Sequence, residues 1–210
     1  MKELEHPWQL EDELLSSGAS VVCGADEAGA GPLMGPVYAA AVILPKHLTI
    51  EGLQDSKKLT PRLRERLYDE IIARAVSWSV ARVEAREIDK TDILSARMKA
   101  MQSAIDGLSV TPDAALIDGN RDAGRSSRIT TPHRCIVGGD GRSASIAAAS
   151  VLAKVSRDRY VTEVLDRLYP QYGFAKHKGY GTKLHYDMLA QYGPCPEHRM
   201  TFLKKWQAQL

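Results

Sequence analysis

The sequence predicts an α/β domain in which a mixed β-sheet is covered by helices. Three early segments have strand character, helical and strand-like segments then alternate, and the chain ends in helical segments from about residue 161. Its 210 residues, of which 44% are hydrophobic, suffice for one sizeable core. We therefore expect residues 1–210 to form a single domain.

The expected strands are short and rich in small or β-branched residues. Val, Ile and Ala dominate the first two, the third alternates between apolar and polar residues, and the last two are brief apolar runs. In chain order they cover residues 21–25, 36–44, 78–83, 114–118 and 135–137.

The expected helices have recognisable starts or stops. Thr60 followed by Pro61 is a typical helix start and predicts a helix to about residue 76. A second helix or helix pair is expected to end at Gly107. The remaining helical segments are residues 87–108, 143–168 (one helix or two), 183–191 and 198–207.

Basic residues are concentrated toward the C-terminal end. Residues 1–141 contain 17 Lys or Arg against 21 Asp or Glu, whereas residues 142–210 contain 11 against 5, in a chain of net charge +2. A polyanionic partner at the last third would account for this asymmetry, although a solvated basic face would give the same count.

Several classes of protein are disfavoured. No stretch approaches the roughly 18 apolar residues of a membrane span, and residues 1–15 hold five acidic residues and no apolar signal core. The cysteines Cys23, Cys135 and Cys195 are odd in number and far apart, which favours reduced thiols over a zinc site. We expect a cytoplasmic monomer without membrane contact.

Two adjacent carboxylates follow the first apolar run, in the segment CGADEAGAGP. Asp26 and Glu27 are costly to bury unless a cation meets them. Because successive side chains of a strand point to opposite faces, the strand must end or twist there if both acids serve one site. Gly29, Gly31 and Pro32 favour such a break.

Two further acids stand in a similar context. Asp118 closes the apolar run 114–117, and Asp140 follows residues 136–139; each precedes a glycine. One such Asp-Gly pair is typical of a turn. Their recurrence beside Asp26 and Glu27 instead favours convergence at one sheet edge, where carboxylate oxygens suit Mg²⁺ or Mn²⁺. Two cations held there can activate a water and stabilise the leaving oxygen of a phosphodiester.

With these motifs the chain resembles the type 2 ribonuclease H family (ribonuclease HII). The resemblance implies an RNase H-like α/β fold and Mg²⁺- or Mn²⁺-dependent hydrolysis of the RNA strand of RNA–DNA hybrids, leaving 3′-hydroxyl and 5′-phosphate ends. It also implies incision of DNA at embedded ribonucleotides, and so a role in replication and repair. Six segments carry it in the family's order: GADEAGAGPLMGPVYAAAV (24–42), LQDSKKLT (53–60), ALIDGNR (115–121), GGDGRSASIAAASVLAKVSRDR (138–159), QYGFAKHKGYGT (171–182) and YGPCPEHR (192–199).

The resemblance places the family's metal ligands on Asp26, Glu27, Asp118 and Asp140. Asp158, in the segment KVSRD, is a rival for the fourth position. If residues 142–158 form mainly one helix, its ends lie roughly 20–25 Å apart, so Asp140 and Asp158 cannot both join one cluster. The context that Asp140 shares with Asp118 favours Asp140.

Telling RNA from DNA requires a contact to the 2′-hydroxyl, which the family makes with a Gly-Arg-Gly loop and a tyrosine. The tyrosine falls on Tyr180 and the loop on Gly29, Ala30 and Gly31, where alanine replaces the usual arginine. Losing that guanidinium–phosphate contact costs about 1.5–3 kcal/mol of binding. The resemblance therefore implies hybrid hydrolysis more strongly than preference for a single embedded ribonucleotide.

Basic side chains are candidates for contacts to the backbone of a duplex, which position it without reading its sequence. The candidates nearest the family motifs are Lys57, Lys58 and Lys178; further ones are Lys154, Arg157, Lys176, Lys183 and Arg199. The alternative function is a hybrid-binding protein without turnover. The four acids argue against it, because a pure binder has no need to gather anions beside a phosphate.

Overall fold

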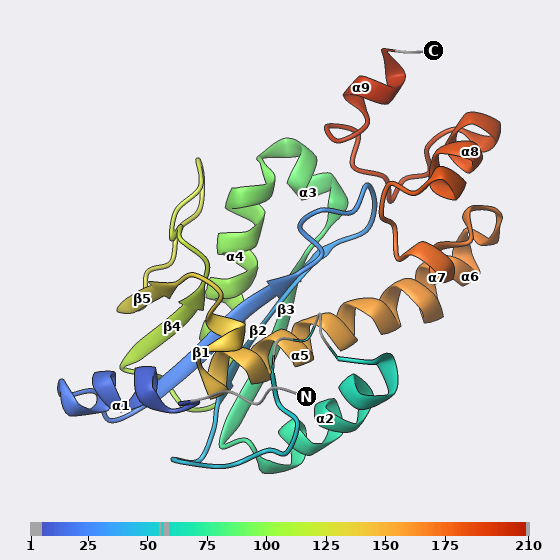
Figure 1. The fold of residues 1–210 in the computed structure, drawn as a ribbon. Coiled ribbons are helices and arrows are strands. Elements are labelled where there is room, and N and C mark those ends of the chain that lie inside the picture. Colours follow the sequence, from blue (N-terminus) through green and yellow to red (C-terminus); the bar gives the residue numbers. More distant parts are fainter. Residues whose placement is uncertain (1–5, 55, 57–58, 209–210) are drawn as a thin grey trace.

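One mixed sheet organises the fold. The structure is a computed structural model that describes residues 6–54, 56 and 59–208. Within these residues the strand order is β3-β2-β1-β4-β5 (Figure 1); β1 is antiparallel to β2 and parallel to β4, β2 and β3 are antiparallel, and β4 and β5 are parallel. The strands are β1 (Val22–Ala28), β2 (Val37–Ile43), β3 (Ser77–Val83), β4 (Ala114–Asp118) and β5 (His133–Ile136). The predicted mixed α/β architecture is confirmed.

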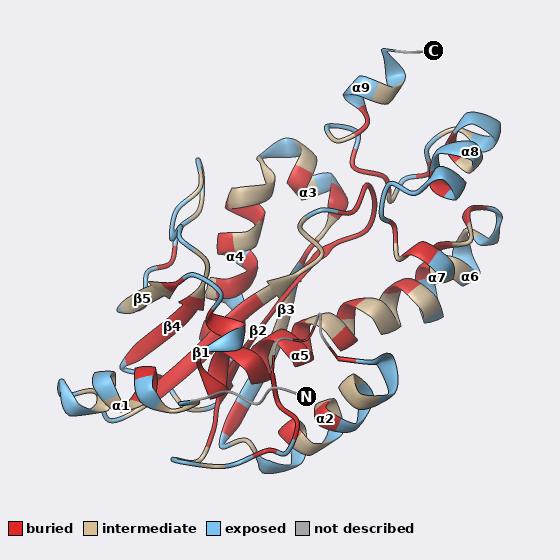
Figure 2. Ribbon diagram, viewed as in Figure 1, coloured by how far each residue is buried: buried red, intermediate tan, exposed pale blue. Residues whose placement is uncertain are grey.

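Helices cover both faces of this sheet. Helix α4 packs against the face that carries Cys23 and Ala25, and α5 with α2 packs against the face that carries Ala40 and Val42. Figure 2 shows that α5 and the central strands are largely buried. The helices are α1 (Gln9–Ser16), α2 (Pro61–Arg74), α3 (Ala85–Lys90), α4 (Ile93–Asp106), α5 (Ala144–Arg159), α6 (Asp166–Leu168), α7 (Phe174–His177), α8 (Lys183–Tyr192) and α9 (Lys204–Gln207).

The C-terminal segments pack beyond the end of α5, beside the loop that joins β1 to β2 (Figure 1). A π-helical stretch, Tyr160–Leu165, connects α5 to α6. The loop is tied to this region by main-chain hydrogen bonds of 2.8 Å: the amide of Leu33 donates to Gly179, that of Gly35 to Glu197, and that of Arg199 to Leu33. The loop that follows Asp26 and Glu27 is therefore held by segments more than 140 residues away.

Two helical segments differ from the prediction. Helix α1 was not expected; it is anchored by the buried carboxylate of Glu11, which accepts hydrogen bonds from the Ser143 and Ser145 hydroxyls. The predicted helix over 198–207 is wrong for its first half, because only Lys204–Gln207 is helical. Residues 198–199 are instead held by distant partners. None of the described helices combines the length and apolar character needed to span a bilayer.

The contact between β1 and α5 depends on Gly24. A Cβ atom at this position would lie 2.2 Å from the main-chain carbon of Ser145 and 2.3 Å from the nitrogen of Ile146. These atoms belong to the first turn of α5, which cannot move aside as a flexible side chain can. We expect Gly24→Ala to lower the free energy of unfolding by about 2–3 kcal/mol, measured by urea denaturation.

Gly141→Ala is the matched control for Gly24→Ala, because a Cβ atom at Gly141 would meet no atom within 4 Å. Its unfolding midpoint should stay close to that of the unsubstituted protein. Equal stability of the two variants would contradict the close packing of β1 against α5.

Candidate metal centre and substrate loop

Asp26 and Glu27 lie inside β1, which continues to Ala28. The expected strand end at residue 25 is therefore wrong, whereas the break that Gly29, Gly31 and Pro32 indicated does occur, at Gly29, whose φ is +92°. As in any regular strand, the two acids point to opposite faces. Asp26 is on the α5 side, where Ser150 hydrogen-bonds to it, and Glu27 is on the α4 side.

Asp118 stands beside Asp26 on the neighbouring strand. The last registered pair of β1 and β4 joins Ala25 to Ile117, and Asp118 is the next residue and the last of β4. Its Oδ1 accepts a hydrogen bond of 2.7 Å from the amide of Gly139. Because β4 ends here while β1 continues, this side of β1 opens at the two aspartates.

Asp140 comes next to them from a different element than expected. It lies in a short 3-10 helix, Gly139–Gly141, that follows β5 and precedes α5, and it is buried. The same turn supplies the Gly139 amide that binds Asp118. The chain between β5 and α5 thus delivers Asp140 and fixes Asp118 at once.

The four acids share one electrostatic neighbourhood. Burial raises the pKa of Asp26 well above its usual value, and the negative charges of Glu27, Asp118 and Asp140 raise it further, while the Ser150 hydrogen bond lowers it. Asp26 also accepts a hydrogen bond of 2.7 Å from the amide of Glu27. Gathering these anions costs free energy that a bound cation would offset.

Glu27 has a cationic partner that the sequence did not reveal. The Nη2 atom of Arg97, in α4, lies 2.6 Å from the Glu27 Oε1 atom. Arg97 sits in the segment ARMKA, where nothing distinguishes it from a surface arginine. Its contact holds Glu27 toward the α4 side of β1.

The donor chemistry suits a hard divalent cation. All four side chains offer carboxylate oxygens, the ligands that Mg²⁺ and Mn²⁺ prefer. Among the described residues, no three His, Cys, Asp or Glu side chains are already arranged to enclose one ion. The hydrogen bonds that Asp26 and Asp118 accept, and the Arg97 contact of Glu27, orient these carboxylates toward protein groups.

Asp158 lies at the far end of α5 from Asp140. Its carboxylate pairs with Lys154 one helical turn away, at 2.8 Å, and it is not among the charges that act on Asp26. Helix α5 has 16 residues, and so spans about 24 Å. The structure therefore brings Asp140, and not Asp158, to the neighbourhood of Asp26.

The loop after β1 lies against the Tyr180 loop. A Cβ atom at Gly31 would be 3.7 Å from Cε1 of Tyr180, whose side chain is exposed. The main-chain hydrogen bond from Leu33 to Gly179 joins the two loops. The structure thus places Tyr180 beside Gly31, a few residues from Glu27.

Two fully buried arginines, Arg157 and Arg199, fasten these loops to the protein. Arg157 donates hydrogen bonds to the carbonyls of Met34, Pro36 and Lys178, at 3.1–3.3 Å. The expectation that both contact the backbone of a duplex is wrong, because their guanidinium groups bind protein carbonyls in the interior. Only the three-dimensional packing reveals this, since either could be a surface cation in the sequence.

Of the three lysines expected near the substrate, the structure describes only Lys178. Lys57 and Lys58 lie outside the described residues. Lys178 is half-buried, its ammonium donates to the carbonyl of Ala175 at 2.8 Å, and desolvation lowers its pKa. The Lys178 ammonium group is therefore held by a main-chain carbonyl close to the Tyr180 loop.

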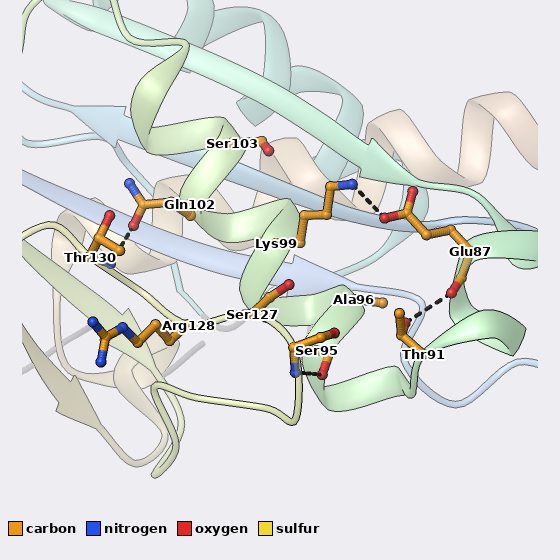
Figure 3. A pocket seen from close by; sticks show the side chains of 11 residues that line it. Glu87, Thr91, Ser95, Ala96, Lys99, Gln102, Ser103, Ser127, Arg128 and Thr130 are labelled. Carbon is orange, nitrogen blue, oxygen red and sulfur yellow. Dashed lines mark hydrogen bonds and ion pairs between the residues drawn. The ribbon is translucent and has the colours of Figure 1, made fainter.

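A hollow of about 520 Å³ lies elsewhere, between α4 and residues 126–130. Figure 3 shows Lys99 paired with Glu87 across it, and Gln102 turned toward Thr130. None of the acids discussed above lines it. A double helix is too wide for such a cavity, so an open sheet edge suits a duplex better.

Comparisons with known proteins agree on one family. The family model described as Ribonuclease HII matches residues 23–208. The chain is 48% identical over 204 residues to a ribonuclease HII of Caldicellulosiruptor bescii, covering 97% of each chain. It is 52% identical over 185 residues to that of Aliivibrio fischeri, covering 88% of this chain and 87% of the other.

Solved structures show the same fold. The ribonuclease H2 of Pyrococcus horikoshii OT3 superimposes with a TM-score of 0.72 at 25% identity, covering 90% of this chain and 98% of the other. A Bst-RNase HIII in complex with Mn²⁺ superimposes with a TM-score of 0.58 at 19% identity, covering 87% of this chain and 64% of the other. Sequence, fold and the gathered acids therefore converge, and the chain belongs to the ribonuclease HII family, metal-dependent endoribonucleases that cleave RNA in RNA–DNA hybrids.

Proposed function

We propose that this ribonuclease HII also incises DNA at embedded ribonucleotides and that Asp26, Glu27, Asp118 and Asp140 form its catalytic centre. The observation that carries the proposal is the placement of the acids: Asp26 and Asp118 lie side by side on paired strands, and the turn that binds Asp118 also carries the buried Asp140. The raised pKa of Asp26, caused by burial and by the three other acids, agrees with this placement. Carboxylates on separate elements that repel one another at an open sheet edge are typical of a site completed by cations.

Each acid has a defined part in this proposal. Asp26 and Asp118 lie side by side on the α5 face and would hold Mg²⁺ or Mn²⁺ together with Asp140, and Glu27, which lies on the α4 side of β1, would complete the set of ligands. Bound there, the cations would supply the charge that activates a water and stabilises the departing 3′-oxygen, leaving a 5′-phosphate. The Gly139 amide keeps the Asp118 carboxylate oriented.

The substrate would lie across the loop of Gly29, Ala30 and Gly31, with Tyr180 against a sugar. Tyr180 is exposed and adjoins Gly31, so its ring and the loop backbone can contact the same nucleotide. Positive charge from Lys178 underlies the Tyr180 loop, and Lys57 and Lys58 remain candidates for phosphate contacts. A cation-dependent duplex nuclease with ribonucleotide selectivity follows from this arrangement, and a role in removing ribonucleotides from DNA follows from that selectivity.

The test compares two labelled duplexes in Mg²⁺ or Mn²⁺: a continuous RNA–DNA hybrid and DNA with one ribonucleotide. We expect both to be cut, leaving 3′-hydroxyl ends. Ala30→Arg should raise kcat/KM for the single-ribonucleotide duplex by about 10- to 100-fold, because a charge-assisted bond contributes about 1.5–3 kcal/mol. Cleavage of the hybrid alone, by both proteins, would limit the function to hybrid hydrolysis.

A further inference from the structure

Arg199 is buried beneath the loop of residues 29–35, and its whole guanidinium group binds that loop. Its Nη2 atom donates to the carbonyl of Gly29 at 2.7 Å, and Nη1 donates to the carbonyls of Ala30 at 3.0 Å and Pro32 at 2.9 Å. Its Nε atom donates to the carbonyl of Gly35 at 2.9 Å. One side chain thus draws four carbonyls of a single loop toward the interior.

Peptide geometry fixes where the amides of this loop point. In a trans peptide unit the C=O of one residue and the N–H of the next point in opposite directions. Since the carbonyls of Gly29 and Ala30 point inward to Arg199, the amides of Ala30 and Gly31 point away from it. Neither amide donates a hydrogen bond to a residue that the structure describes.

The Pro32 carbonyl provides an internal check. It too binds Arg199, and the amide of the next residue, Leu33, points the other way and donates to Gly179 in the Tyr180 loop. The same alternation that joins the two loops at Leu33 therefore presents two amides at Ala30 and Gly31.

Positive charge lies beneath these amides. Within the described residues, neither Arg199 nor the neighbouring buried Arg157 forms an ion pair with a carboxylate. Arg157 lies directly under Gly29, where a Cβ atom would be 2.1 Å from its Nε atom. Burial and Arg157 lower the pKa of Arg199 to about 9, while the charge of Asp89 raises it, so Arg199 remains charged at neutral pH. Outward amides above two cations that have no direct carboxylate partner favour an anion.

We propose that Arg199 is a positioning residue that turns the backbone of residues 29–31 into a phosphate-binding element for the nucleic-acid substrate. This inference rests on the proposed function, because it assigns the anion to the phosphodiester beside the acids. It explains how a loop with alanine at position 30 can hold a phosphate. The amides of Ala30 and Gly31 bind the phosphate, and the buried guanidinium groups of Arg199 and Arg157 supply the positive charge.

The first test measures binding separately from cleavage. In an Asp118→Asn background, the dissociation constant of a fluorescent duplex with one ribonucleotide is measured by anisotropy for Arg199→Met and Arg199→Lys. We expect Arg199→Met to weaken binding at least about tenfold, the size of one charge-assisted contact, and Arg199→Lys to restore part of it. In the active background, KM should rise more than kcat falls.

Arg159→Met is the matched control, because Arg159 ends the same helix as Arg157 but is only partly buried and pairs with Glu65. It should bind and cleave as the unsubstituted protein does. Unchanged duplex binding by a folded Arg199→Met variant would overturn the inference.

A second measurement leaves Arg199 in place and so does not depend on folding of the variants. In ¹⁵N-alanine- and ¹⁵N-glycine-labelled Asp118→Asn protein, the amide resonances of Ala30 and Gly31 should shift strongly when the duplex is added. Gly18, which precedes β1 at the end of the strand opposite the loop, serves as the reference resonance. Saturating duplex without a shift at Ala30 or Gly31 would refute the inference.

The two proposals can fail separately. If unsubstituted protein does not cut at embedded ribonucleotides but Ala30 and Gly31 still respond to the duplex, the phosphate-binding loop stands and the proposed function fails. If cleavage occurs as proposed while Arg199→Met binds normally, only the role of Arg199 fails.

Discussion

Replacing Asp26 with asparagine should abolish cleavage and at the same time stabilise the metal-free protein. Asparagine has nearly the same shape and can still accept a hydrogen bond from the Glu27 amide, but it cannot take on the negative charge that burial and three other acids oppose. Loss of a ligand should lower kcat/KM on a hybrid by about a thousandfold or more, equivalent to about 4 kcal/mol. For a chain of this size, each kcal/mol of relieved repulsion raises the melting temperature by about 2–4 °C.

Thermal melts in EDTA and in Mn²⁺ give the second half of this prediction. Mn²⁺ should raise the melting temperature of the unsubstituted protein and have a smaller effect on Asp26→Asn. At a given Mn²⁺ concentration, the folded state is stabilised less when its affinity for the ion is lower. Asp118→Asn should also lose cleavage while remaining folded.

Asp158→Asn is the control, since Asp158 pairs with Lys154 away from the acids. It should retain cleavage and the response to Mn²⁺. Loss of activity in Asp158→Asn with retention in Asp26→Asn would refute the proposed centre.

Acidification should destabilise the protein through a pair of buried histidines. The Cys195 amide donates to Nδ1 of His198, so Nε2 of His198 carries its proton and donates to Nε2 of His185 at 3.0 Å. Nδ1 of His185 then donates to the Tyr180 carbonyl. Every ring nitrogen is used in the neutral form, and a second proton on either ring would set two donors against each other.

The groups around this pair reinforce the effect. His177 stacks on His185 with ring centroids 4.5 Å apart, and Phe174 packs edge-on against His185. Burial above all, and the neighbouring histidines after it, lower the pKa values of His185 and His198 to about 4, while backbone hydrogen bonds raise them. No carboxylate is among the groups that act on either ring.

The sign of the pH dependence follows from these pKa values. Unfolded histidines take up protons near pH 6.5, whereas the folded pair stays neutral to about pH 4, so stability is present above pH 6.5 and is lost as the pH falls through that window. One histidine contributes about 3 kcal/mol over the window, at about 1.4 kcal/mol per pH unit.

Urea denaturation between pH 7 and pH 4.5 measures this slope in the Asp26→Asn background, because the raised pKa of Asp26 acts with the opposite sign in the same range. His198→Gln should flatten the slope, whatever its stability at pH 7. An unchanged slope would show that the histidine pair is not the acid-sensitive element.

The sequence alone identified the features that depend on short contiguous segments, namely the strands, the start of α2 and the motifs that carry the acids. Apolar periodicity predicted the five strands, and the Thr60–Pro61 start placed α2 within two residues of its end. The DEAG segment and the later Asp-Gly pairs marked the four acids, because these motifs carry their own local context. Family resemblance needed only such segments in order, and the comparisons confirm it.

Contacts between segments that are distant in the sequence could not be predicted in this way. Asp26 and Glu27 point to opposite faces because the pairing of β1 with β2 extends the strand to Ala28, beyond the expected end at residue 25, and the chain turns only at Gly29. The C-terminal helix loses its first half because Arg199 binds the loop at residues 29–35 instead of solvent.

Sequence by itself thus determined the family, the fold class and the acids proposed to carry the chemistry, since local patterns and motifs mark strands, helices and family segments one stretch at a time, whereas the order of the strands in the sheet came from the structure. The tertiary structure decided which acids share a face, that Arg97 meets Glu27, and that Arg157 and Arg199 lie inside rather than on a duplex. The physical reason is that a sequence does not show whether a charged side chain is buried or exposed. Only packing determines whether a guanidinium group meets water, phosphate or the carbonyls of a loop 170 residues away.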